Sequence, residues 1–342
     1  MQRFDLPDAR FFPIGRRDPN ETRQHLWWSG SGVRVKLACT RVDVEVTCTS
    51  ADHAQWLGVL MDGAPVARFP ILEGTHTYTA LAGLDSHFPH EITVIRDTQP
   101  SYDEAGPVIL NAVITDGEPQ EAEARSQMIE FIGDSLTVGE GTMGPYGEGQ
   151  EWRMVFVSHM PAFPTLVAEE LKADKRVVAL GGWGAARSWD NQPESRIGRI
   201  YNQLCGITPG GDVPAPADER PADAVVINLG TNDSSALTRV EANELPLVRA
   251  ELRTRAVELM EAVRARYPQA VILWAYGLCG HTVEDILKGA VEDVRANGDQ
   301  NAYYLSLSDA KTLGARMHPS RDSHRQAARE IVDTLKKLLK LE

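Results

Sequence analysis

The chain has 342 residues, of which 42% are hydrophobic and 24% charged, a composition typical of soluble globular proteins. Its length suggests about two domains. The net charge of −13 argues against a nucleic-acid partner and against binding to an anionic membrane.

Targeting and metal-binding signals are missing from the sequence. It shows no signal peptide and no apolar run of the ~18 residues that span a membrane, so we expect a cytoplasmic protein. The four cysteines have no CxxC spacing and are interpreted as reduced core residues, with a Cys39–Cys48 disulfide as a minor alternative. No His, Cys or acidic cluster has ligand spacing, so we expect neither a metal nor another cofactor.

Residues 1–122 are predicted to form an antiparallel β-sandwich, because short apolar segments recur without a long helical period. Several segments alternate polar and apolar residues, as half-buried strands do. Asp62-Gly63 is a strong signal for a hairpin turn. The predicted strands are 33–37, 42–46, 56–61, 76–81, 91–95 and 108–114.

The pattern changes after residues 123–127, which are interpreted as a linker. From residue 128 to 342, apolar strands alternate with helical segments, which predicts a second domain with a parallel sheet between helices. The predicted strands are 129–132, 177–180, 224–229, 271–276 and 302–307, and the predicted helices are 163–172, 247–266, 283–297 and 324–339.

Ser135 directly follows the first strand of this second domain and the strand-breaking residues Gly133 and Asp134. The carboxyl ends of parallel strands meet at the edge of the sheet where α/β proteins bind ligands. This position favours a reacting group, although a serine there is equally typical of a helix N-cap.

Three further stretches are expected near the same edge. Gly182 and Asn232 each follow a predicted strand, and a glycine N–H or an asparagine amide can donate a hydrogen bond to an oxyanion. Both residues also suit ordinary turns. Pro319 disfavours helix at His318, which we therefore place on a loop before the last helix. His324 is interpreted as structural, and the glycine-rich segment 139–161 either forms a wall of the pocket or is a surface loop.

The motifs together resemble a known family. Gly133-Asp134-Ser135-Leu136, Gly182, Gly230-Thr231-Asn232-Asp233 and His318-Pro319 occur in the order of the four blocks of SGNH (GDSL-type) hydrolases. A sandwich entered through Trp27-Trp28-Ser29-Gly30-Ser31-Gly32 makes the whole chain similar to carbohydrate esterase family 2. The resemblance implies a jelly-roll-like sandwich before an α/β/α hydrolase domain. It also implies removal of acetyl groups from xylan- or mannan-derived carbohydrate.

The same resemblance assigns roles to individual residues. Ser135 would be the nucleophile, and His318 would take its proton and return it to the leaving alcohol. The Ser135 N–H, the Gly182 N–H and the Asn232 amide would form the oxyanion hole. Trp183 and Asp233 are expected to contact substrate, whereas Trp189 is better explained by core packing.

One position departs from the family pattern. Most SGNH hydrolases carry Asp three residues before the catalytic His, and this chain has Ala315 there. We therefore favour a Ser–His dyad in which a backbone carbonyl orients His318, as is understood for some family 2 esterases. Asp309 and Asp322 are the alternative third members of a triad.

Two other functions fit the same motifs. The same fold can hydrolyse a lysophospholipid or an acyl thioester, although the polar segment 139–150 argues against a long apolar groove. The missing Asp at position 315 also allows a carbohydrate-binding protein with a decayed site. The expected partner is an acetylated carbohydrate, and the oligomeric state is left open.

Overall fold

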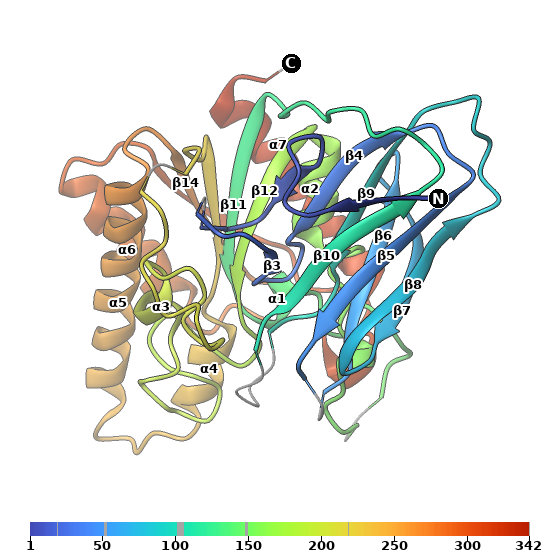
Figure 1. Cartoon of the computed structure of the whole chain (residues 1–342). Coiled ribbons are helices and arrows are strands. Elements are labelled where there is room, and N and C mark those ends of the chain that lie inside the picture. Colours follow the sequence, from blue (N-terminus) through green and yellow to red (C-terminus); the bar gives the residue numbers. More distant parts are fainter. Residues whose placement is uncertain (19, 51–52, 101–105, 148–149, 218, 342) are drawn as a thin grey trace.

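The computed structural model describes residues 1–18, 20–50, 53–100, 106–147, 150–217 and 219–341. Two antiparallel sheets precede a parallel sheet that is covered by helices, as the sequence predicts (Figure 1). The segment 139–161 includes positions 148 and 149, which lie outside the described residues.

The N-terminal half consists of two five-stranded antiparallel sheets that enclose one apolar core. One sheet has the order β1-β10-β5-β8 with β3 also paired to β10, and the other has the order β2-β4-β9-β6-β7. The strands are β1 (Gln2–Asp5), β2 (Phe12–Ile14), β3 (Gln24–Leu26), β4 (Gly32–Leu37), β5 (Arg41–Cys48), β6 (Gln55–Met61), β7 (Ala64–Ile71), β8 (Gly74–Ala82), β9 (His90–Arg96) and β10 (Val108–Thr115).

The predicted hairpin at Asp62-Gly63 is confirmed. Asp62 and Gly63 have φ angles of 51° and 79°, as the tight turn between β6 and β7 requires. The sequence analysis did not predict β1, β2, β3 or β7. The first three are too short to show a period, and β7 contains two prolines.

The C-terminal half is built on a parallel sheet with the order β12-β11-β13-β14-β15. Ile132 and Trp274 pack with α5 and α6 on one face, whereas Phe131 and Leu273 pack with α2 and α7 on the other. The strands are β11 (Gln127–Gly133), β12 (Ala173–Ala179), β13 (Ala224–Asn228), β14 (Val271–Tyr276) and β15 (Ala302–Ser306). The helices are α1 (Ser135–Val138), α2 (Phe163–Glu170), α3 (Ile197–Ile200), α4 (Thr231–Leu237), α5 (Leu245–Arg266), α6 (Glu284–Ala296) and α7 (Arg321–Leu339), with 3₁₀ turns η1 (Met154–Phe156) and η2 (Ala315–Met317).

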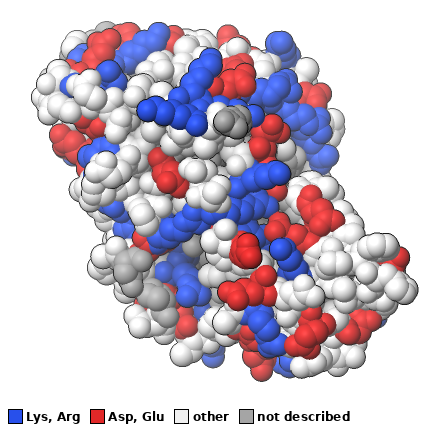
Figure 2. Space-filling view, turned by 90° about the horizontal axis from the view of Figure 1, so that it is seen from above, with Lys and Arg blue, Asp and Glu red and all other residues white. Residues whose placement is uncertain are grey.

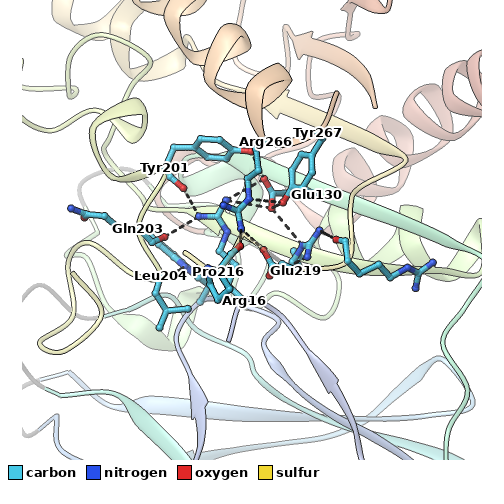
Figure 3. A network of polar contacts seen from close by, with 12 residues as sticks. Arg16, Glu130, Tyr201, Gln203, Leu204, Pro216, Glu219, Arg266 and Tyr267 are labelled. Carbon is cyan, nitrogen blue, oxygen red and sulfur yellow. Dashed lines mark hydrogen bonds and ion pairs between the residues drawn. The ribbon is translucent and has the colours of Figure 1, made fainter. Parts of the chain in front are cut away.

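A buried arginine joins the two halves of the chain. Arg16, which follows β2, and Glu130 on β11 both have fully buried side chains, and Arg16 Nη2 lies 3.3 Å from Glu130 Oε1. Arg16 also donates hydrogen bonds to the Tyr201 and Gln203 carbonyls (Figure 3). Burial raises the pKa of Glu130, but the charges of Arg16 and Arg176 outweigh this effect and hold that pKa below its usual value. Glu130 is therefore a carboxylate that depends on its buried cationic partners.

Ion pairs extend this junction to the surface. Arg34 on β4 lies 2.8 Å from Asp174 on β12, and Arg125, just before β11, pairs with both Glu91 on β9 and Glu169 on α2. Figure 2 views the molecule from this end, where basic and acidic side chains lie next to one another across the surface. The amino ends of β11 and β12 are thus tied to the sandwich by paired charges.

The structure also tests the expectations on cysteines and on membrane segments. None of the four cysteines forms a disulfide, so the disulfide alternative for Cys39 and Cys48 is wrong. Cys279 is exposed, and its interpretation as a core residue is wrong as well. Within the described residues, no helix has the length and apolarity that crossing a membrane requires.

We predict that Arg16→Met lowers the free energy of unfolding by about 3–5 kcal/mol, because it leaves the buried Glu130 carboxylate without its main cation. Arg3→Met is the control. Arg3 also pairs with a glutamate, Glu45, but its side chain is 43% exposed, and such a pair is worth only about 0–1 kcal/mol. Urea unfolding of the two variants measures the difference, and equal losses would contradict a special role for the buried pair.

Candidate active site

Three strand ends bring the predicted site residues together. β11 pairs in parallel with both β12 and β13, so that Gly133 lies opposite Ala179 on one side and Asn228 on the other. The segments that follow these strands carry Ser135, Gly182 and Asn232. All three line one cavity of about 560 Å³, together with His318. The parallel register alone therefore explains why residues far apart in the sequence share one site.

Ser135 is the first residue of α1, and Asp134 is the residue that caps the helix. Asp134 Oδ1 accepts a hydrogen bond from the Leu136 N–H at 3.0 Å. The alternative interpretation of Ser135 as the N-cap is therefore wrong. Its hydroxyl is instead 3.0 Å from His318 Nε2.

The second ring nitrogen of His318 faces a backbone carbonyl. His318 Nδ1 lies 3.0 Å from the Arg316 oxygen. Because a carbonyl only accepts hydrogen bonds, Nδ1 carries the proton, and Nε2 is left with the lone pair that accepts from the Ser135 hydroxyl. The ring is thus held in the tautomer that a general base needs.

The two aspartates considered as third triad members have other partners. Asp309 Oδ1 lies 3.6 Å from His281 Nε2, and Asp322 Oδ1 lies 2.7 Å from Arg325. Both carboxylates are largely exposed. The geometry around His318 is that of a dyad oriented by the main chain.

An unusual backbone conformation aims the Arg316 carbonyl. Arg316 and the following Met317 have φ angles of 54° and 61°, in the left-handed region that non-glycine residues rarely adopt. Arg316 is anchored on both sides, since its N–H donates to Gln150 Oε1 at 2.7 Å and its guanidinium donates to Glu140 Oε1 at 2.5 Å. These anchors offset the cost of the strained turn.

Glu140 is a site residue that the sequence analysis missed. Its side chain is only 4% exposed, and Oε2 lies 3.7 Å from His318 Nε2. The carboxylate therefore lies beside the ring nitrogen that faces Ser135. The only sequence feature that pointed to Glu140 as a site residue was its position in the glycine-rich segment after Ser135.

The oxyanion donors predicted from the sequence lie beside the nucleophile. The Asn232 amide donates to the Trp183 carbonyl at 2.8 Å and to Asp134 Oδ2 at 3.2 Å. Gly182 has a φ of 81°, which places its peptide in a tight turn at the cavity wall. Both amide hydrogens of Asn232 are thus already donated, so one of these bonds must give way before the amide can bind an oxyanion. Its role as an oxyanion donor stays a prediction.

Asp134 is a second carboxyl directly beneath the nucleophile. Burial raises the pKa of Asp134 to about 7; the Leu136 N–H opposes this shift, and the charges of Asp233 and Glu140 add to it. Near neutral pH a part of the molecules therefore carries a neutral carboxyl at this position. In those molecules Asp134 carries no negative charge, and the repulsion between Asp134 and an oxyanion at the site is reduced.

Asp233 does not lie where the sequence analysis expected it. Its carboxylate is buried and accepts hydrogen bonds from the N–H groups of Ala185, Ala186 and Arg187 at 2.8–2.9 Å. It is also missing from the residues that line the cavity. Its role in this structure is to hold the loop after Gly182, in place of the substrate contact predicted for it.

Three tryptophans line the cavity: Trp152, Trp183 and Trp189. Trp183 packs partly against the core, as a cavity wall residue can. Trp189 is 51% exposed with Arg239 stacked on its ring at 5.0 Å, so its interpretation as core packing is wrong. Trp152 was not predicted. Flat aromatic faces of this kind bind the apolar faces of ring-shaped ligands.

His324 is structural, as interpreted from the sequence. The Phe163 N–H donates to its Nδ1 at 3.2 Å, and burial together with the nearby His318 lowers its pKa to about 3. Its ring is therefore neutral. Across the described part of the chain, no group of three His, Cys, Asp or Glu side chains is arranged to hold a metal ion.

We predict that Gly141→Ala lowers kcat for 4-nitrophenyl acetate by about 100-fold, since displacing a reacting group by about 1 Å costs this much. A Cβ at Gly141 would lie 2.4 Å from the His318 Cβ and must push the histidine away from Ser135. Gly210→Ala is a matched control, because Gly210 has the same φ of +82° and no neighbour within 4 Å of the added Cβ. Similar kcat values for the two variants would contradict the prediction.

Comparison with known proteins identifies a family for each half of the chain. Residues 131–338 match the GDSL-like Lipase/Acylhydrolase family, and residues 13–121 match the Carbohydrate esterase 2 N-terminal domain. The chain is 27% identical to the cellulase/esterase CelE of Acetivibrio thermocellus over 94% of its own length, and it spans 38% of that protein. It is 23% identical to an acetylxylan esterase/glucomannan deacetylase of Cellvibrio japonicus, over 97% of this chain and 90% of that one.

A solved structure shares the whole fold. The acetyl xylan esterase Est2A from Butyrivibrio proteoclasticus superposes with a TM-score of 0.94 at 24% identity, and the match covers 100% of both chains. The resemblance seen in the sequence motifs is thereby confirmed. The chain belongs to the GDSL-like Lipase/Acylhydrolase family, joined here to a Carbohydrate esterase 2 N-terminal domain.

Proposed function

We propose that the protein is a serine esterase that removes acetyl groups from carbohydrate. The observation that carries the proposal is the chain of hydrogen bonds from Ser135 through His318 to the Arg316 carbonyl, each 3.0 Å long, at the wall of a cavity lined by tryptophans. The names of the relatives support acetylated xylan and glucomannan as the substrate class.

The reaction follows from the positions of these groups. The Ser135 oxygen attacks the ester carbonyl while His318 Nε2 takes the hydroxyl proton. The imidazolium that forms keeps its Nδ1–H on the Arg316 carbonyl and gains attraction from the Glu140 carboxylate. The negative charge on the substrate oxygen is stabilised by the Ser135 and Gly182 N–H groups, and by the Asn232 amide once one of its two present hydrogen bonds gives way.

The second half of the reaction uses the same groups in reverse. His318 gives its proton to the sugar oxygen as its bond to the acetyl carbon breaks, and the acetyl group remains on Ser135. Water then attacks the carbonyl carbon of the acetyl group while His318 Nε2 takes one of its protons. His318 returns this proton to the Ser135 oxygen as the acetyl–Ser135 bond breaks, and acetic acid leaves and ionises to acetate. None of these steps requires a carboxylate at position 315.

The cavity favours a sugar over a long acyl chain. Apart from glycines, the lining residues that the structure describes are three tryptophans and the polar residues Gln99, Ser135, Glu140, Ser188, Asp190, Ser195, Asn232, Arg316 and His318. No aliphatic side chain appears among them, whereas a lysophospholipid or a long acyl thioester needs an apolar groove. Retention of a complete hydrogen-bonded dyad also argues against a decayed, binding-only site. The cytoplasmic location expected from the sequence stays a prediction.

We expect the wild type to hydrolyse 4-nitrophenyl acetate much faster than the octanoate, and to release acetate from acetylated xylo- or manno-oligosaccharides. Ser135→Ala and His318→Ala should each lower kcat by about 10⁴-fold or more, as losses of triad members do. Asp309→Asn and Asp322→Asn are matched controls that should keep their activity. Collapse of either Asp variant would contradict the dyad, and a wild type inert on every short acyl ester would refute the esterase.

A further inference from the structure

The sandwich domain places one side chain directly in the catalytic cavity. Gln99 lies three residues after β9 and is 1% exposed, yet it lines the same cavity as Ser135 and His318. Its side-chain oxygen accepts the Gly181 N–H at 2.9 Å, and its carbonyl accepts a hydrogen bond from Arg96 at 3.1 Å. Gln99 therefore holds a fixed position next to the predicted oxyanion donor Gly182.

The nitrogen of the Gln99 side-chain amide makes no hydrogen bond to the described residues. Gln99 Nε2 is buried and has no hydrogen-bond partner among the described residues. A buried donor without a partner costs about 1–3 kcal/mol, and buried polar groups in proteins are nearly always paired. Because Oε1 is fixed on Gly181, the amide cannot rotate to pair Nε2 elsewhere without losing that bond. Because Gln99 lines the cavity, a bound ligand can supply the missing partner.

The surroundings of Gly181 indicate which part of a substrate the Gln99 donor would contact. A Cβ built on Gly181 would lie 3.0 Å from Gln99 Oε1, 3.4 Å from Glu140 Oε2 and 3.4 Å from the Ser135 Cβ. The amide, the carboxylate and the nucleophile therefore converge on one spot. Glu140 Oε2 is also 3.7 Å from His318 Nε2, the atom that returns a proton to the leaving alcohol. An alcohol that receives this proton leaves past Glu140, which brings the sugar next to this spot.

An amide donor beside a carboxylate acceptor fits a hydroxyl group, which both accepts and donates. We propose that Gln99 Nε2 and Glu140 Oε2 together bind the free hydroxyl on the carbon next to the one that carries the ester. The proposal rests on the proposed esterase function and deepens it. It makes the sandwich a direct determinant of specificity for sugars over simple alcohols.

The test compares substrates with and without that hydroxyl. The probes are the best-hydrolysed monoacetate of methyl β-D-xylopyranoside and its deoxy analogues, each lacking one hydroxyl adjacent to the ester. In the wild type, one analogue should lose about tenfold in kcat/KM, the value of about one strong hydrogen bond. Sites built to bind a hydroxyl discriminate in this way against analogues without it.

Two variants remove the donor. Gln99→Met removes both polar atoms, whereas Gln99→Glu, assayed at pH 8, keeps an oxygen for the Gly181 N–H and removes only the donor. In both variants the same deoxy change should cost less than about threefold, because the hydrogen bond is already lost. Gln120→Glu, an equivalent change on the exposed surface of the same domain, should keep the tenfold effect.

The outcomes separate the two proposals. Full tenfold sensitivity in both Gln99 variants, or equal losses on the sugar acetates and on 4-nitrophenyl acetate, would overturn the role of Gln99 at the hydroxyl. The second pattern would indicate that Gln99 acts through the Gly181 loop or on the oxyanion. A wild type inert on all of these esters would refute the esterase itself, whatever the variants do.

Discussion

The structure depends on a buried ion pair between its two halves. Arg16 comes from the sandwich and Glu130 from the strand that ends at the nucleophile turn, and neither side chain reaches solvent. Two buried charges are costly unless they are paired and hydrogen-bonded, and of these two side chains only Arg16 Nε has no hydrogen-bond partner among the described residues. Here carbonyls of the second domain bind the arginine, and the Tyr201 and Tyr267 hydroxyls bind the glutamate. The strand that leads to Ser135 is therefore fixed by a group from another domain.

The catalytic end of the molecule also depends on contacts from the sandwich domain. Gln99 comes from the sandwich and binds the peptide next to Gly182, while Asp97 accepts the Met160 N–H at 3.0 Å and pairs with Arg68. The hydrolase domain therefore does not form the cavity alone. One described lining residue, Gln99, comes from the sandwich, so both domains contribute to the site.

Much of this arrangement could be predicted from the sequence, and the rest could not for physical reasons. Apolar strands that end in Gly, Ser or Asn revealed Ser135, Gly182 and Asn232, because the parallel sheet places every such ending at one edge. Glu140 and Gln99 gave no comparable signal, since their roles arise from contacts between segments distant in sequence. Trp189 was misjudged because residue type alone does not tell a core aromatic from one at a cavity mouth.

The missing aspartate at position 315 was visible in the sequence, but what replaces it was not. No sequence pattern announces that Arg316 takes a left-handed conformation, because the side-chain anchors Glu140 and Gln150 lie more than 160 residues away in the chain. Asp233 was likewise predicted from its motif to contact substrate, whereas the structure uses both of its oxygens on the loop after Gly182.

Orienting the histidine through a peptide carbonyl has an evolutionary consequence. A carboxylate that orients a catalytic histidine can be deleted by a single codon change, and it loses its charge in acid. The Arg316 oxygen belongs to the main chain, so every amino acid that can adopt the left-handed turn at position 316 supplies it, and it does not titrate. Selection can then act on the side chain at this position, which faces the cavity, while the acceptor for His318 is inherited unchanged as long as the turn keeps its shape.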